Sequence, residues 1–98
     1  MKIKILKKEK NELKFELEGE GHTFCNLLQK ALLESKDVEM AGYNIPHPLA
    51  ANPIVYVRTK GKKTPEKVLI EAAEKMKEMQ KEFMEAFNKA LKVEPSSS

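Results

Sequence analysis

His22 and Cys25 are the only pair of side chains in this sequence that resembles a nucleophile with its base. The thiolate is the reactive form of cysteine, and both a helix N-terminus and a neighbouring imidazole favour it. Nucleophilic catalysis also needs a third, orienting group and an oxyanion pocket, and no motif in the sequence supplies either. We therefore expect Cys25 to be a small buried apolar residue and His22 to be a surface histidine.

Metal and phosphate sites can be considered in the same region. His22, Cys25 and His47 could be three zinc ligands, but a structural zinc site needs four nitrogen or sulfur donors in paired short spacings. Gly19 and Gly21 resemble part of a phosphate-binding loop, without its third glycine or its Gly-Lys-Ser/Thr ending. We predict no catalytic residue, metal or cofactor, and expect these glycines to reverse the chain between a strand and a helix.

Lysines concentrate in two segments. Residues 1–10 and 58–67 each hold five basic side chains and one acidic side chain, so each segment carries a balance of +4. These segments could contact a phosphate backbone, and Phe15, Tyr43 and Tyr56 could stack on bases if they share one face of a sheet. Lysine-rich strands and turns are also common as plain solvated surface. A stand-alone small nucleic-acid-binding α+β domain is therefore an alternative function.

Length and composition restrict the possible classes of protein. The chain of 98 residues is enough for one domain with a thin core, and its net charge of +3 is low for a dedicated nucleic-acid binder. The single cysteine excludes a disulfide framework. No segment has the pattern of a signal peptide or a membrane span. We expect an intracellular, cytoplasmic protein.

The elements that would position these residues follow from the hydrophobic pattern. Residues 13–18 alternate apolar and charged side chains, residues 2–5 do the same, and residues 38–45 and 54–59 also have strand character. Between the second and third strands, apolar residues recur at the spacing of an amphipathic helix, with Thr23 expected as its N-cap. This helical set is Phe24, Leu27, Leu28, Ala31 and Leu32.

The last helix is predicted over residues 65–91. Thr64 and Pro65 form a strong helix start, and no glycine or proline interrupts the segment that follows. Two series of apolar residues seven apart run along it, namely Leu69, Met76, Phe83 and Ala90, and Ala72, Met79 and Ala86. Such a helix would be ~40 Å long, whereas a compact domain of this size is about 32 Å across. We therefore expect its distal end to overhang the sheet and to expose apolar side chains to a partner.

The predicted fold class is α+β. The element order is ββαββα, which forms a two-layer domain with a four-stranded, mostly antiparallel sheet, two helices on one face and a long C-terminal helix. Residues 1–93 are expected to form this single domain, and residues 94–98 a disordered tail.

Three segments of the chain resemble the subunit L family of archaeal DNA-directed RNA polymerases. They are Gly19-Glu20-Gly21-His22-Thr23-Phe24-Cys25-Asn26-Leu27-Leu28, Ala41-Gly42-Tyr43-Asn44-Ile45-Pro46-His47-Pro48-Leu49, and Thr64-Pro65-Glu66. The eleventh subunit of eukaryotic RNA polymerase II and the N-terminal domain of the bacterial α subunit are related. The similarity covers roughly residues 3–91. Gly21, Phe24 and Cys25 depart from the usual family motif, and Cys25 stands where the family has glycine.

The resemblance implies a non-catalytic assembly subunit in DNA-templated transcription. Its expected partner is the larger alpha-like subunit of the polymerase (D in the family's nomenclature), and their heterodimer would form the platform for the two large catalytic subunits. Contact with nucleic acid would be only indirect, and no membrane or small-molecule substrate is expected. The first helix and the C-terminal helix are expected to form the interface, through His22, Thr23, Phe24, Asn26, Leu27, Leu28, Leu69, Met76, Met79, Phe83, Met84 and Phe87.

Overall fold

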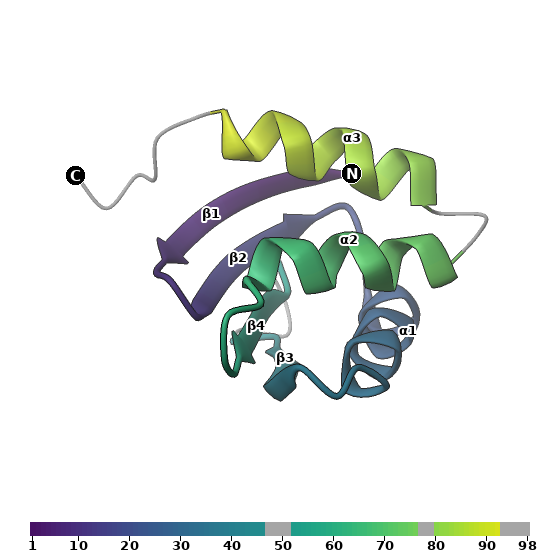
Figure 1. Cartoon of the computed structure of the whole chain (residues 1–98). Coiled ribbons are helices and arrows are strands. Elements are labelled where there is room, and N and C mark those ends of the chain that lie inside the picture. Colours follow the sequence, from purple (N-terminus) through teal and green to yellow (C-terminus); the bar gives the residue numbers. More distant parts are fainter. Residues whose placement is uncertain (47–51, 77–79, 93–98) are drawn as a thin grey trace.

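A computed structural model describes residues 1–46, 52–76 and 80–92 of the chain, so the predicted C-terminal tail lies outside the described residues. The elements are β1 (Lys2–Lys8), β2 (Glu12–Glu18), α1 (His22–Leu33), β3 (Val38–Asn44), β4 (Ile54–Thr59), α2 (Pro65–Lys75) and α3 (Gln80–Leu91). The four strands form one antiparallel sheet in the order β1-β2-β4-β3 (Figure 1). The predicted α+β class and the four strands are confirmed.

Alternation along the strands determines which face of the sheet carries the core. Leu13, Phe15 and Leu17 of β2 are fully buried, and their neighbours on the opposite face are charged. Phe15 pairs with Val55 of β4, so the apolar side chains of adjacent strands lie on the same face. All three helices contribute apolar side chains to this one core. The arrangement is a two-layer packing of helices on a sheet.

The loop between β2 and α1 confirms one prediction and contradicts another. Gly19 has φ +94°, a conformation that strains other residues, and it reverses the chain as expected. However, Gly21 and not Thr23 is the N-cap of α1. The Gly21 carbonyl accepts a hydrogen bond from the Cys25 N–H at 3.1 Å, which closes the first turn two residues earlier than predicted without any side-chain cap.

The start of α2 agrees with the sequence. The Thr64 side chain accepts a hydrogen bond from the Lys67 N–H at 3.3 Å, and Pro65 occupies a position where no intrahelical donor is needed.

The prediction of one continuous helix over residues 65–91 is wrong for this chain alone. α2 ends at Lys75, and the Met76 N–H bonds the Ala73 carbonyl at 3.0 Å instead of continuing the α-helical pattern. α3 then runs beside α2 in the opposite direction (Figure 1). The longest dimension of the molecule is 36 Å, which is shorter than the ~40 Å expected for the continuous helix.

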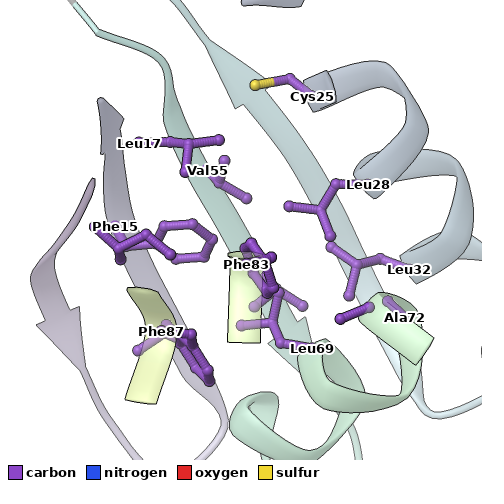
Figure 2. Packing of buried hydrophobic residues seen from close by; sticks show 14 of the residues in the cluster. Phe15, Leu17, Cys25, Leu28, Leu32, Val55, Leu69, Ala72, Phe83 and Phe87 are labelled. Carbon is purple, nitrogen blue, oxygen red and sulfur yellow. The ribbon is translucent and has the colours of Figure 1, made fainter. Parts of the chain in front are cut away.

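Four phenylalanines explain why α3 returns to the sheet. Phe83 and Phe87 of α3 are fully buried, and their stacked rings lie 5.8 Å apart. The ring of Phe15 is 6.4 Å from Phe83 and 6.2 Å from Phe87 (Figure 2). The ring of Phe24 is 5.8 Å from Phe83. Burying a phenylalanine stabilises by about 1.5–3 kcal/mol, which favours packing on the chain's own sheet over exposure to water. The expected exposed apolar end of the last helix is therefore contradicted.

Candidate functional site

A hydrogen-bonded group of three side chains joins the start of α1 to β3. Nδ1 of His22 lies 2.8 Å from the Tyr43 hydroxyl, and this hydroxyl donates to Oδ1 of Asn26 at 3.2 Å. The His22 and Tyr43 rings also meet edge to face, with their centroids 5.7 Å apart. The Tyr43 hydroxyl therefore links the His22 ring to Asn26, and whether Nδ1 of His22 donates or accepts is set by the imidazole tautomer. The imidazole is thus fixed as a structural link between a helix and a strand.

A polar hollow of about 590 Å³ lies beside this group. Glu20, His22, Tyr43 and Asn44 are among its lining residues, together with Ile45, Asn52 and Pro53. Asn52 donates to a carboxylate oxygen of Glu16 at 3.0 Å, so its amide is already engaged. Among the described residues, no buried side-chain polar atom lacks a hydrogen-bond partner.

The outward face of α1 carries an apolar side chain in an otherwise polar surface. Leu27 is 49% exposed, and its neighbours one turn away, Thr23 and Lys30, are exposed and polar. A groove of about 250 Å³ runs beside Leu27 between α1 and the end of α2. Its lining also includes Ala31 and Met76, and the groove is bordered by an ion pair of 3.4 Å between Lys75 and Glu34. An apolar groove with a charged rim is the usual anatomy of a protein–protein contact.

Cys25 cannot act as a nucleophile in this environment. The residue is buried beside Leu17, Val55 and Leu28 in the core (Figure 2). Burial raises the pKa of the Cys25 thiol to about 11, and the nearby charge of Glu20 acts in the same direction. At neutral pH the thiol is therefore protonated and inaccessible. The expectation of a small buried apolar cysteine beside a surface histidine is confirmed.

Zinc binding would require several ligands close together in this region. Within residues 1–46, 52–76 and 80–92, no three histidine, cysteine, aspartate or glutamate side chains are grouped closely enough to hold a metal ion. His47 lies outside the described residues. Across that same part of the chain, none of the helices is both long and apolar enough to cross a membrane.

The three aromatic residues expected to stack on bases do not share a surface. Tyr56 pairs with Lys14 and lies on the face of the sheet opposite Phe15, while Tyr43 pairs with Val55 on the core face. Phe15 is fully buried, and Arg58 lies over the Tyr56 ring at 5.8 Å. Because side chains on a strand alternate between faces, these residues cannot form one stacking platform.

The residues expected at a partner interface differ widely in accessibility. His22, Thr23, Asn26 and Leu27 are exposed, and Met76 and Met84 are half-buried. Five others are buried in the core of the chain itself, namely Phe24, Leu28, Leu69, Phe83 and Phe87. Met79 lies outside the described residues. Only the outward face of α1 and the two methionines are accessible in the arrangement described.

Two residues near α1, Tyr43 and Leu33, are not among the residues predicted at the interface. Tyr43 belongs to the site because it bonds both His22 and Asn26, and its place in a compositionally unusual segment is the only signal that could identify it. Leu33, at the end of α1, is 53% exposed. Helical spacing could indicate it, because Leu33 falls off the apolar stripe of α1 while Leu32 falls on it.

Comparison with known proteins gives a consistent result. The family model described as the RNA polymerase Rpb3/Rpb11 dimerisation domain matches residues 12–86. DNA-directed RNA polymerase subunit Rpo11 of Pyrococcus furiosus is 50% identical over 94 residues, which cover 94% of this chain and 99% of the relative. The same subunit of Methanocella arvoryzae is 39% identical over 92 residues, with the same coverage. The crystal structure of DNA-directed RNA polymerase subunit L from Thermoplasma acidophilum matches with a TM-score of 0.69 and 28% identity over 92% of this chain and 88% of that chain.

The matched segment contains the surface described above. Residues 12–86 include all of α1, the groove beside Leu27 and the part of α3 that carries Phe83. Among the residues expected at the interface, only Phe87 falls just beyond the match. The similarity therefore extends over the helices and is not confined to the sheet.

Proposed function

The chain belongs to the RNA polymerase Rpb3/Rpb11 dimerisation domain family, in its archaeal Rpo11 branch, and from this we propose that it is an assembly subunit of DNA-directed RNA polymerase that pairs with the larger alpha-like subunit. The heterodimer serves as the cytoplasmic platform on which the two large catalytic subunits assemble. The observation that carries this proposal is the match of a dimerisation domain to residues 12–86, since this segment includes the accessible face of α1.

The surroundings of Cys25 and His22 support a non-catalytic role for this subunit. The Cys25 thiol is buried and has a raised pKa, and His22 is held by Tyr43. Neither group is placed to act on a substrate. The active site of the complex accordingly belongs to other subunits.

The first part of the proposed interface is the outward face of α1. Leu27 and the groove beside it provide an apolar centre, and His22, Thr23 and Asn26 provide polar contacts around the N-terminal turn. Covering the exposed half of a leucine contributes on the order of 1 kcal/mol. A single such contact is too small for a stable complex, so this face needs a second apolar surface.

The second part of the proposed interface is the C-terminal region, through Leu69, Met76, Phe83, Met84 and Phe87. Phe83 and Phe87 fill the core of the isolated chain, so they can meet the alpha-like subunit only if α3 leaves its own sheet. Exposing both rings to water would cost about 3–6 kcal/mol. We therefore propose an exchange in which an equivalent helix of the alpha-like subunit takes the place of α3. The seven-residue spacing of Leu69, Met76, Phe83 and Ala90 supports this, because one apolar stripe then continues along both helices.

The contribution of α1 can be tested by placing a charge at its apolar centre. Leu27→Asp should weaken binding to the alpha-like subunit by at least about tenfold, which corresponds to 1.4 kcal/mol. Met40→Asp is a matched control, because Met40 is exposed to nearly the same extent, 50% against 49%, but lies on β3. Binding is measured by titration of labelled chain with the purified alpha-like subunit. Equal affinities for the wild type and both variants would remove α1 from the interface.

The exchange can be tested by isotope-filtered nuclear Overhauser measurements. In the labelled free chain, the Phe83 ring should show contacts to Phe15, whose centroid lies 6.4 Å away. When labelled chain is bound to the unlabelled alpha-like subunit, Phe83 should lose these contacts and gain contacts to the unlabelled partner. If the Phe83–Phe15 contacts persist in the complex, α3 has not moved, and the buried residues are core residues only.

A further inference from the structure

The fold brings the two lysine-rich segments of the sequence to one end of the molecule. The Thr59 N–H bonds the Asn11 carbonyl at 2.9 Å, and the Asn11 side-chain amide donates to the Gly61 carbonyl at 3.2 Å. These bonds join the turn between β1 and β2 to the turn between β4 and α2, which lie together in Figure 1. The Lys60 N–H bonds the Asp37 carbonyl at 3.0 Å, which adds the turn between α1 and β3. We call this surface, residues 7–12, 36–39 and 58–71, the lysine end.

The positive charge of the whole chain is concentrated at the lysine end. The three segments hold nine basic and six acidic side chains, and this surplus of three equals the formal net charge of the chain. All six acidic groups lie in ion pairs with only four basic groups, namely Lys7, Lys8, Arg58 and Lys63. The remaining basic groups are exposed and in no ion pair within the described part of the chain. They are Lys10, Lys36, Lys60, Lys62 and Lys67.

We propose that the lysine end binds the phosphate backbone of duplex DNA directly, in contrast to the indirect contact that the family resemblance implies. Lysine is one of the residues that contact nucleic-acid backbones, whereas it is depleted in protein–protein interfaces, where aromatic and other apolar side chains form the centre. The exposed large hydrophobic residues of the described structure are Leu27, Leu33 and Met40, and of these only Met40, which pairs with Arg58, borders the lysine end. The surface therefore has the charge for phosphates and lacks the apolar centre for a protein partner.

The dimensions and charge of the surface fit a duplex. Neighbouring strands lie about 4.8 Å apart, so the end of a four-stranded sheet is about 15 Å wide. Over that length duplex DNA carries about nine phosphate charges, one per ~1.7 Å. The five lysines outside the ion pairs are thus fewer than the phosphate charges along the same length of duplex. Because the contacts are to the backbone, we expect binding without sequence preference and with a strong dependence on salt.

The number of lysine–phosphate contacts determines how strongly the affinity for DNA should depend on salt. Neutralising five phosphates predicts a slope of about −4.5 in a plot of log affinity against log salt, which is about a 500-fold loss of affinity between 50 and 200 mM salt. The triple variant Lys10→Gln, Lys60→Gln, Lys62→Gln should reduce the slope by about 2.7, and each single variant by about 0.9. The control triple variant Lys2→Gln, Lys4→Gln, Lys81→Gln changes the net charge equally at exposed positions away from the lysine end and should keep the full slope.

The measurement is the fluorescence anisotropy of a labelled 20-base-pair duplex titrated with the full chain at several salt concentrations. A steep slope that only the lysine-end variants flatten would support the proposal. Absent binding, a flat salt response or an equal effect of the two triple variants would overturn it.

A second titration uses a poly-glutamate peptide in place of the duplex. The proposal would also be overturned if the lysine-end triple variant lost affinity for this peptide while its affinity for the duplex stayed unchanged, because the partner would then be an acidic protein. Co-purification of the lysine-end variant with the alpha-like subunit should be unaffected, which separates this test from that of the pairing function.

Discussion

Cys25 is expected to be unreactive in the folded protein. With its pKa raised to about 11, only on the order of 0.1% of the thiol is ionised at pH 8, and the sulfur is buried as well. Native chain should therefore react with a thiol-specific disulfide reagent at least about tenfold more slowly than chain unfolded in urea. Since Cys25 is the single cysteine, the assignment of the signal is unambiguous. Equal rates in the two states would show that the thiol is accessible.

The pKa of Glu12 can be used to test the ion pairs at the lysine end. Lys7 Nζ lies 2.9 Å from a carboxylate oxygen of Glu12, and this hydrogen bond lowers the pKa of Glu12 below its ordinary value of 4.5, with a further contribution from Arg58. A carboxyl group with a lowered folded pKa stabilises the protein above its unfolded pKa, and this contribution is lost as the pH falls through the folded pKa. Lys7→Met should therefore raise the pKa of Glu12 in a carboxyl NMR titration. Lys4→Met, on the same strand, should not change it.

Single residues differ in how far the sequence determines their surroundings. The burial of Cys25 and the exposure of His22 are expected because the sequence lacks the other parts of a nucleophilic site, and both predictions are confirmed. The partner of His22 could not be predicted in this way, because Tyr43 lies 21 residues away and meets it only where α1 packs beside β3. Side-chain contacts between elements depend on tertiary packing, which local periodicity does not describe.

Among the helices and strands, α3 is expected to contribute strongly to stability because it packs on the sheet through buried phenylalanines. Phe83→Ala should lower the free energy of unfolding of the isolated chain by about 3–5 kcal/mol, because it removes a fully buried ring. Leu33→Ala, at a position 53% exposed, should lower it by less than about 1 kcal/mol. Urea unfolding monitored by circular dichroism measures both. Similar small effects for the two variants would place α3 away from the core.

The helix starts provide a second test at this scale. Thr64 caps α2, so Thr64→Ala should destabilise the chain by about 1 kcal/mol, and Thr64→Ser should restore most of the loss. Thr23→Ala should have an effect below about 0.5 kcal/mol, because Gly21 and not Thr23 is the N-cap of α1. The same unfolding measurement applies. A larger effect at Thr23 than at Thr64 would contradict the described helix starts.

The strands and the start of α2 could be predicted from sequence because their signals are local. Alternation fixes the buried face of β2, and Thr64 with Pro65 fixes where α2 begins. The end of α2 at Lys75 could not be predicted, since neither glycine nor proline marks it. Its cause is the packing of Phe83 and Phe87 against Phe15 on a strand far away in the chain. A seven-residue apolar repeat indicates which face of a helix is buried but not which surface covers it.

At the scale of the whole molecule, two surfaces have different chemistry. The outward face of α1 and its groove combine an apolar centre with a charged rim, which suits a protein partner. The lysine end holds the net positive charge and suits a polyanion. The family resemblance predicts the first surface from motif residues. The second could only be recognised once the strand order had brought two separate lysine-rich segments together.

Size-exclusion chromatography with light scattering shows whether this chain pairs with the alpha-like subunit. Purified chain, with a mass of 11.2 kDa, is mixed with the purified alpha-like subunit at equal concentrations, and the mass across each eluted peak is measured. We expect a single peak whose mass is that of one alpha-like subunit plus one copy of this chain. Two separate peaks, each with the mass of its own component at micromolar concentrations, would contradict it.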